Sequence, residues 1–96
     1  MLRITDFIWL ESVIEKLEVK HGVDPGEVEE VFANREDLRL RKVKKGRIRQ
    51  EHVYRALGRT HGGRYLVVFF IHKPPSQAFI VSAREMDAKE RRGYAK

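Results

Sequence analysis

An uninterrupted apolar segment, residues 65–71, constrains the fold of this chain more than any other feature. Its side chains are apolar at both odd and even positions, so both faces of a strand formed by it would be buried, which predicts a central strand. Gly62 and Gly63 precede it and predict a tight hairpin turn in which paired glycines supply positive φ. Pro74 and Pro75 interrupt the chain after it. The segment is far shorter than the roughly 18 residues that indicate a membrane span.

Further strands are expected on both sides of this segment. Residues 52–60 before the turn and residues 77–83 after the prolines have the composition of strands. Leu38 and Leu40 alternate with arginines, which indicates a short edge strand that runs into a mobile basic loop.

Capping residues mark the beginnings of two expected helices. Asp24 has Pro25 after it and Glu27 three residues on, so it predicts a capping box at the start of a short helix that closes near Asn34. Asp87 and Glu90 form the same pattern for a C-terminal helix from about residue 88.

A longer helix is predicted over residues 9–20 by an apolar stripe at helical spacing. Asp6 is the nearest capping residue, so this helix can also begin a turn earlier. Gly22 is placed to end it in a left-handed conformation. The whole pattern predicts one α+β domain, residues 1–96, in which a small antiparallel sheet of three to four strands packs with two N-terminal helices and a C-terminal helix.

The net charge of +6 favours an anionic partner, either nucleic acid or an acidic protein, although it can also serve solubility alone. The charge is densest in one stretch, which can hold phosphates or an acidic segment, or be a solvated loop. Its basic residues are Arg39, Arg41, Lys42, Lys44, Lys45, Arg47 and Arg49.

No cysteine is present, which excludes disulfides, a thiolate nucleophile and a cysteine-bound zinc. The histidines lack the i, i+4 pairing of a metal site, so no metal is expected. The N-terminus lacks the layout of a signal peptide, and we therefore expect a cytoplasmic protein with no membrane association.

Three stretches of the chain, which together span nearly everything except residues 35–50, match a known pattern. They are Trp9 with residues 20–23 (Lys-His-Gly-Val) and 29–32 (Glu-Glu-Val-Phe); residues 56–60 (Ala-Leu-Gly-Arg-Thr) and 63–68 (Gly-Arg-Tyr-Leu-Val-Val); and residues 80–84 (Ile-Val-Ser-Ala-Arg) and 89–92 (Lys-Glu-Arg-Arg) with Tyr94. In these stretches the chain resembles the BrnT ribonuclease toxins of type II toxin–antitoxin systems. The stretch from residue 82 to Tyr94 is the most specific part.

The resemblance implies a RelE-like fold and cleavage of RNA without a metal or other cofactor. It also implies a neutralising antitoxin, and a toxin–antitoxin complex that represses its own promoter, so that DNA is contacted only through that complex. Where family members usually carry polar residues, however, this chain has Leu10, Val13, Leu17 and Phe79. These departures keep open an alternative function, a catalytically silent RNA- or protein-binding module on the same scaffold.

Cleavage of RNA without a metal needs a base for the 2′-hydroxyl, positive charge for the phosphorane and an acid for the leaving oxygen. Arg84 is the first candidate for the charge, because the resemblance is strongest there and a guanidinium can hold two phosphate oxygens. Alternatively, Arg84 forms an ion pair with Glu85 or Glu90. His21 is the best acid–base candidate, although it can equally bond the last carbonyls of its helix.

Four further residues are weaker candidates. Arg55 and Arg59 share one face of their strand and can form a row of phosphate ligands or a solvated sheet face. Glu51 can act in catalysis or merely neutralise nearby arginines. Tyr94 can act in catalysis or pack the last helix onto the sheet.

Overall fold

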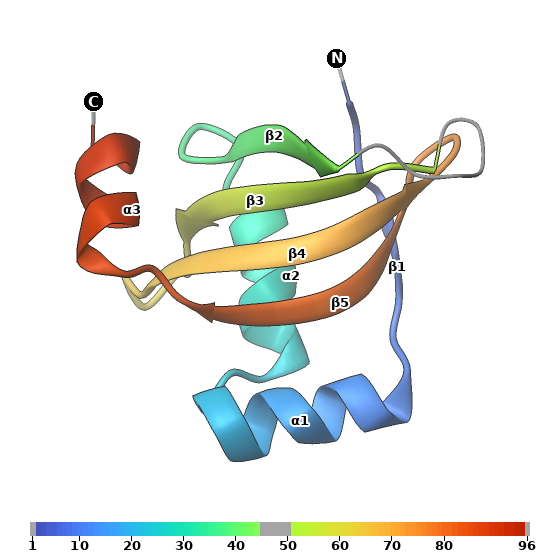
Figure 1. Ribbon diagram of the computed structural model, residues 1–96, viewed down its shortest axis with the longest axis horizontal. Helices are drawn as coiled ribbons and strands as arrows, with labels where there is room; N and C mark the ends of the chain where they lie inside the picture. Colours follow the sequence, from blue (N-terminus) through green and yellow to red (C-terminus); the bar gives the residue numbers. More distant parts are fainter. Residues whose placement is uncertain (1, 45–50, 96) are drawn as a thin grey trace.

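The computed structural model describes residues 2–44 and 51–95 as three helices and a five-stranded sheet (Figure 1). In chain order the elements are β1 (Asp6–Ile8), α1 (Glu11–His21), α2 (Pro25–Ala33), β2 (Arg39–Lys44), β3 (Val53–Arg59), β4 (Tyr65–Lys73), β5 (Gln77–Glu85) and α3 (Ala88–Tyr94). The predicted α+β class is confirmed. Among the described residues, no helix is long and apolar enough to cross a membrane.

The sheet has the strand order β1-β5-β4-β3-β2, so the apolar segment does form the central strand, as predicted. The expected strand count and the purely antiparallel pairing were wrong. β1 pairs parallel with β5 and makes the sheet five-stranded and mixed. β1 has three residues, too few for a periodic signal, and only its long-range pairing makes it a strand.

Two helix starts and one helix end follow the sequence closely. Asp24 and Asp87 each accept a hydrogen bond from the backbone N–H of the glutamate three residues on, and both capping boxes are complete. Gly22 ends α1 at φ 59°, in the predicted left-handed conformation. The start of α1 was predicted too early. Leu10 precedes the helix without a side-chain cap, and Asp6 belongs to β1.

The hairpin between β3 and β4 differs from its prediction in one respect. Gly63 alone takes positive φ, at 90°, and Gly62 does not. The turn is instead closed by Thr60, whose backbone N–H donates to the Arg64 carbonyl and whose side-chain oxygen accepts from the Arg64 N–H. The Thr60 side chain therefore helps to close a turn for which a second residue with positive φ had been expected.

α1 and α2 lie on one face of the sheet and α3 lies on the other. α1 packs against β5, and α2 packs against β3 and β4. Their side chains complete the main core, in which Phe32 of α2 meets Phe70 of β4 edge to face at 5.3 Å. At Gly58 a Cβ would lie 2.9 Å from Val31 Cγ1, so glycine permits the close approach of α2 to β3. On the other face, Tyr94 of α3 packs against a smaller cluster of Leu57, Val67 and Met86.

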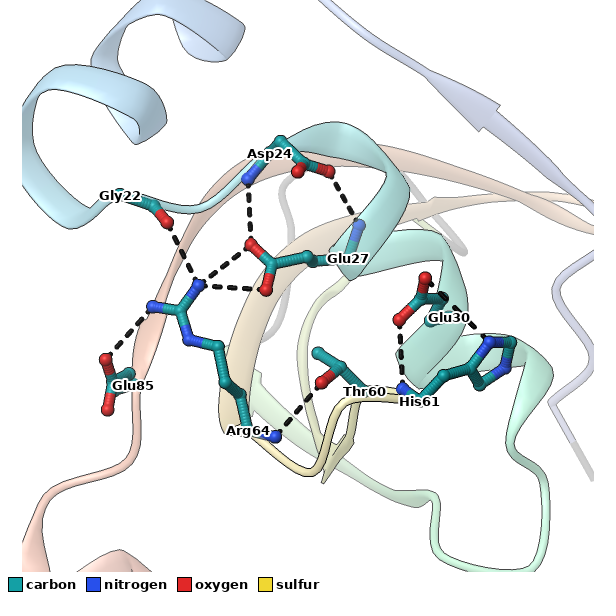
Figure 2. A network of polar contacts seen from close by, with 8 residues as sticks. All are labelled: Gly22, Asp24, Glu27, Glu30, Thr60, His61, Arg64 and Glu85. Carbon is teal, nitrogen blue, oxygen red and sulfur yellow. Dashed lines mark hydrogen bonds and ion pairs between the residues drawn. The ribbon is translucent and has the colours of Figure 1, made fainter.

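A polar network centred on Arg64 ties two turns and the end of a strand together (Figure 2). The Arg64 guanidinium donates to both Glu27 oxygens at 2.8 and 2.9 Å, to the Gly22 carbonyl at 3.0 Å and to Glu85 at 3.0 Å. Close by, Glu30 accepts a hydrogen bond from the His61 backbone N–H. The network joins the α1–α2 turn and the β3–β4 turn to the end of β5.

Candidate nucleic-acid interface

Four arginines from three strands gather on the sheet face that carries α3. The register sets Arg39 opposite Leu57 and Arg41 opposite Arg55, so these side chains leave the same face of β2 and β3. Leu57 in turn lies opposite Val67, and Val67 opposite Arg84. Because side chains opposite one another share a face, Arg39 and Arg84 end one row across the sheet, and Arg41 and Arg55 begin the next. We call these four residues the arginine face.

A hollow of about 560 Å³ opens where α3 meets this face. Leu57 lies on its floor, and three of the four arginines line it. The lining residues are Arg39, Arg41, Arg55, Leu57, Asp87, Lys89, Glu90, Gly93 and Tyr94. The hollow therefore combines cations from the sheet with titratable side chains from α3.

Arg84 and Glu90 connect the sheet to α3 at this hollow. Arg84 Nη1 and Nη2 donate to the two Glu90 oxygens at 2.8 and 2.9 Å. Glu90 Oε1 also accepts from the Asp87 backbone N–H. These hydrogen bonds, that from Arg84 above all, lower the pKa of Glu90, and the charge of Arg55 lowers it further. The ion-pair alternative for Arg84 is confirmed.

Tyr94 anchors the far end of α3. Its hydroxyl donates to the Asp37 carbonyl in the loop before β2, and its ring meets Tyr65 edge to face at 5.9 Å. Burial raises the pKa of the Tyr94 hydroxyl. The prediction that Tyr94 packs the last helix onto the sheet is confirmed.

Arg59 lies beside the arginine face, one row further along β3. Its guanidinium carbon lies 4.9 Å from the centre of the Tyr65 ring, and that of Arg91 lies 4.1 Å from the same ring. These are cation–π distances. Arg59 Nε is buried and has no hydrogen-bond partner among the described residues. Arg55 and Arg59 do share a face, as the alternation along the strand predicted.

With this geometry in place, the chain was compared with known proteins. The family described as the ribonuclease toxin, BrnT, of type II toxin–antitoxin systems matches residues 9–90. The chain belongs to the BrnT family. A comparison with curated proteins gave no match. Membership makes the chain a ribonuclease toxin of a toxin–antitoxin system, with an antitoxin protein as its partner.

Two of the BrnT chain's predicted catalytic residues lie apart from the arginine face. His21 is the last residue of α1, in the helical layer on the other side of the sheet, and is half-buried. Glu51 precedes β3 and contacts Lys73 Nζ at 2.6 Å, at the end of the sheet where β4 turns into β5. That ion pair matches the neutralising role considered for Glu51, although its cation is a lysine.

The basic stretch of the BrnT chain is divided by the fold. The structure makes residues 39–44 a strand, where a loop was expected beyond Leu40. From Arg39 to Lys42, before the register shift, successive side chains point to opposite faces. Lys42 therefore faces the helical layer, with its Nζ 6.0 Å from the centre of the Tyr54 ring. Lys44 ends β2. Lys45, Arg47 and Arg49, and the loop expected there, lie outside the described residues.

Three of the four apolar departures from the usual BrnT pattern belong to the α1 layer, whereas Phe79 lies on the same sheet face as the arginine face, one row beyond Arg41 and Arg55. Leu17 is fully buried in the main core, and Val13 packs against it. Leu10 is 46% exposed before α1. Phe79 pairs with Ile71 near the β4–β5 turn, where Lys73 Nζ lies 5.9 Å from its ring centre. Two of the four thus strengthen the packing of α1.

Local sequence reasoning missed two groups of the candidate site. Lys89 was noted only within the family pattern and given no role in a site, yet it lines the hollow. Leu57, Val67 and Phe69 form an apolar floor between the arginines, and the Arg84 guanidinium carbon lies 5.8 Å from the Phe69 ring centre. The i, i+2 alternation along each strand could have predicted that these apolar side chains share a face. Their position beside Arg84, however, depends on the register between the strands.

Proposed function

We propose that this BrnT toxin binds RNA on the arginine face and cleaves it there without a metal ion. The observation that carries the proposal is the convergence of Arg39, Arg41, Arg55 and Arg84 from three strands on one face of the sheet, where the first three line one hollow. Clustered arginines suit a phosphodiester backbone, because their planar forks bond pairs of phosphate oxygens.

The proposed reaction is attack of a ribose 2′-oxygen on the adjacent phosphorus. The bond from O2′ to phosphorus forms and the bond to O5′ breaks, while the 2′-hydroxyl releases its proton to solvent water and the leaving oxygen takes a proton from the Tyr94 hydroxyl. The phosphorane between these events carries extra negative charge, which Arg55 and Arg84 are placed to stabilise. No metal is required for that charge, since the guanidiniums supply it.

Tyr94 and Glu90 are the proton-carrying groups that α3 brings to the hollow. The raised pKa of Tyr94 keeps its hydroxyl protonated at neutral pH, which suits a donor to the leaving oxygen. The lowered pKa of Glu90 keeps it ionised, and an incoming phosphate must take over its contacts with Arg84. His21 has no part in this scheme, because it lies in the other layer.

The antitoxin is proposed to neutralise this activity, and the complex of the two proteins is proposed to bind its own promoter. DNA then contacts the antitoxin rather than the arginine face. The basic surface of the toxin is available for RNA when the antitoxin is absent.

The experiment is cleavage of a single-stranded RNA by purified protein in excess EDTA. The wild type is expected to cleave, Arg55→Ala is expected to cleave at least about a hundredfold more slowly, and Lys20→Ala is expected to match the wild type. Lys20 is an exposed residue of α1 and controls for the lost charge. RNA binding without cleavage would favour the silent binding module instead. Equal cleavage rates for Arg55→Ala and Lys20→Ala would show that the catalytic site is not on the arginine face.

A further inference from the structure

A second and larger hollow, of about 840 Å³, lies along β2. It is bounded by the N-terminal segment before β1, the end of α2, the edge strand β2 and its neighbour β3. Its lining residues are Leu2, Arg3, Ile4, Phe32, Arg35, Leu38, Arg39, Leu40, Arg41 and Tyr54. We call it the β2 groove. It shares Arg39 and Arg41 with the hollow on the arginine face.

The floor of the β2 groove is apolar. Leu2, Ile4, Leu38, Leu40 and Tyr54 pack against the main core yet remain partly exposed. Below them, Phe32 is 5% exposed. A contiguous apolar surface with a polar border is typical of grooves that bind a protein or another ligand.

The border of the groove is wholly cationic. Its charged lining residues are Arg3, Arg35, Arg39 and Arg41, and no carboxylate among the described residues lines it. The guanidiniums of Arg3 and Arg35 make no hydrogen bond or ion pair with any other residue in ranges 2–44 and 51–95. These charges are therefore unneutralised within the described part of the chain, and an acidic partner would complement them.

We propose that the β2 groove docks an acidic amphipathic helix of the protein partner, the antitoxin. A helix places apolar side chains at i, i+3, i+4 and i+7 along one stripe and carboxylates beside them, which matches an apolar floor between arginines. Strand addition suits the groove less well, because alternate cations along β2 protect that edge.

This docking also gives a route to neutralisation, and in that respect it rests on the proposed function. Carboxylates that pair with Arg39 and Arg41 from the groove side remove two of the four cations of the arginine face. The bound helix then weakens RNA binding without entering the hollow beneath α3.

The probe for the experiment is a synthetic helical peptide with a stripe of Leu along one face and Glu beside it. The controls are an analogue with Lys in place of each Glu and an isomer with the same composition in scrambled order. In a titration followed by amide NMR, the acidic peptide is expected to shift resonances of Leu38, Leu40 and Tyr54. The two control peptides are expected to leave them in place. Shifts confined to Arg55, Arg84 and α3, or equal shifts with the scrambled isomer, would overturn the proposal.

The deciding variant is Arg3→Glu/Arg35→Glu, which reverses the groove's border without touching the arginine face. It is expected to weaken peptide binding at least about tenfold and to leave RNA cleavage unchanged. The matched control, Lys16→Glu/Lys20→Glu on exposed positions of α1, is expected to retain peptide binding. Equal peptide binding by the two variants would contradict docking in the β2 groove. Loss, in the groove variant, of a self-association that the wild type shows would contradict it too, because a second copy of the chain would then be the occupant.

The peptide titration and the cleavage assay test the docking surface and the proposed function independently. Peptide binding at the groove with no RNA cleavage would refute the proposed function and leave the docking surface intact. Cleavage that the bound peptide does not slow, despite binding at the groove, would refute the link between docking and neutralisation.

Discussion

Both oxygens of the Glu90 carboxylate face the Arg84 guanidinium, at 2.8 and 2.9 Å from its two terminal nitrogens. A carboxylate in this two-point contact occupies the positions that two phosphate oxygens would take. The ion pair thus holds α3 against the sheet and competes with an anionic ligand for the same arginine.

Glu90→Gln is therefore expected to bind RNA more tightly than the wild type, by about two- to tenfold. Removal of the carboxylate charge frees Arg84 and strengthens the positive potential of the hollow. Glutamine can still accept the hydrogen bond from the Asp87 N–H, so the capping box is kept. Fluorescence anisotropy with a 2′-O-methylated RNA measures the change. The control is Glu18→Gln on exposed α1, and an equal gain in that variant would show a mere effect of net charge.

The same ion pair predicts a dependence of stability on pH. Hydrogen bonds from Arg84 lower the pKa of Glu90 below its ordinary value of 4.5. A lowered carboxylate pKa in the folded state stabilises the protein above the unfolded pKa, and that contribution is lost as pH falls through the folded pKa. The difference in unfolding free energy between wild type and Glu90→Gln should therefore shrink as pH falls below about 4.5. Urea denaturation at a series of pH values tests this, and a constant difference would contradict it.

The network around Arg64 predicts a cost in stability rather than in RNA binding. Arg64→Ala is expected to lower the free energy of unfolding by about 2 kcal/mol, because the Glu27 carboxylate loses its paired cation. The free energy of unfolding of Arg64→Lys is expected to lie between those of the wild type and Arg64→Ala. An ammonium group lacks the planar fork with which the guanidinium bonds Glu27 and Glu85 at once. Chemical denaturation gives the values. Arg92→Ala, at an exposed site of α3, should change stability by no more than about 0.5 kcal/mol.

The local features of the fold could be predicted from sequence because local chemistry determines them. The capping boxes at Asp24 and Asp87 and the left-handed Gly22 depend on residues within one helical turn, and they lie where the sequence indicated. β1 could not be found in this way. Its three residues become a strand only through pairing with β5, far along the chain.

The candidate site was predicted residue by residue but not as an arrangement. Arg84, Arg55 and Arg39 were all candidates, yet their convergence depends on the register of four strands. His21 was placed with them although it belongs to the opposite layer, since nothing local to a helix end tells which face of the sheet it will cover. Lys42 was grouped with Arg41 by proximity in sequence, and the strand's alternation separates them.

The binding of RNA phosphates to the arginine face can be measured by the salt dependence of binding to a 2′-O-methylated single strand. Four phosphate contacts predict a slope of log K against log salt of about −2.8, from about −0.7 per contact, and Arg41→Ala/Arg55→Ala should reduce it to about −1.4. Lys16→Ala/Lys20→Ala on α1 should leave the wild-type slope unchanged. A slope that is unaffected in the arginine variant but reduced in the α1 variant would contradict the account.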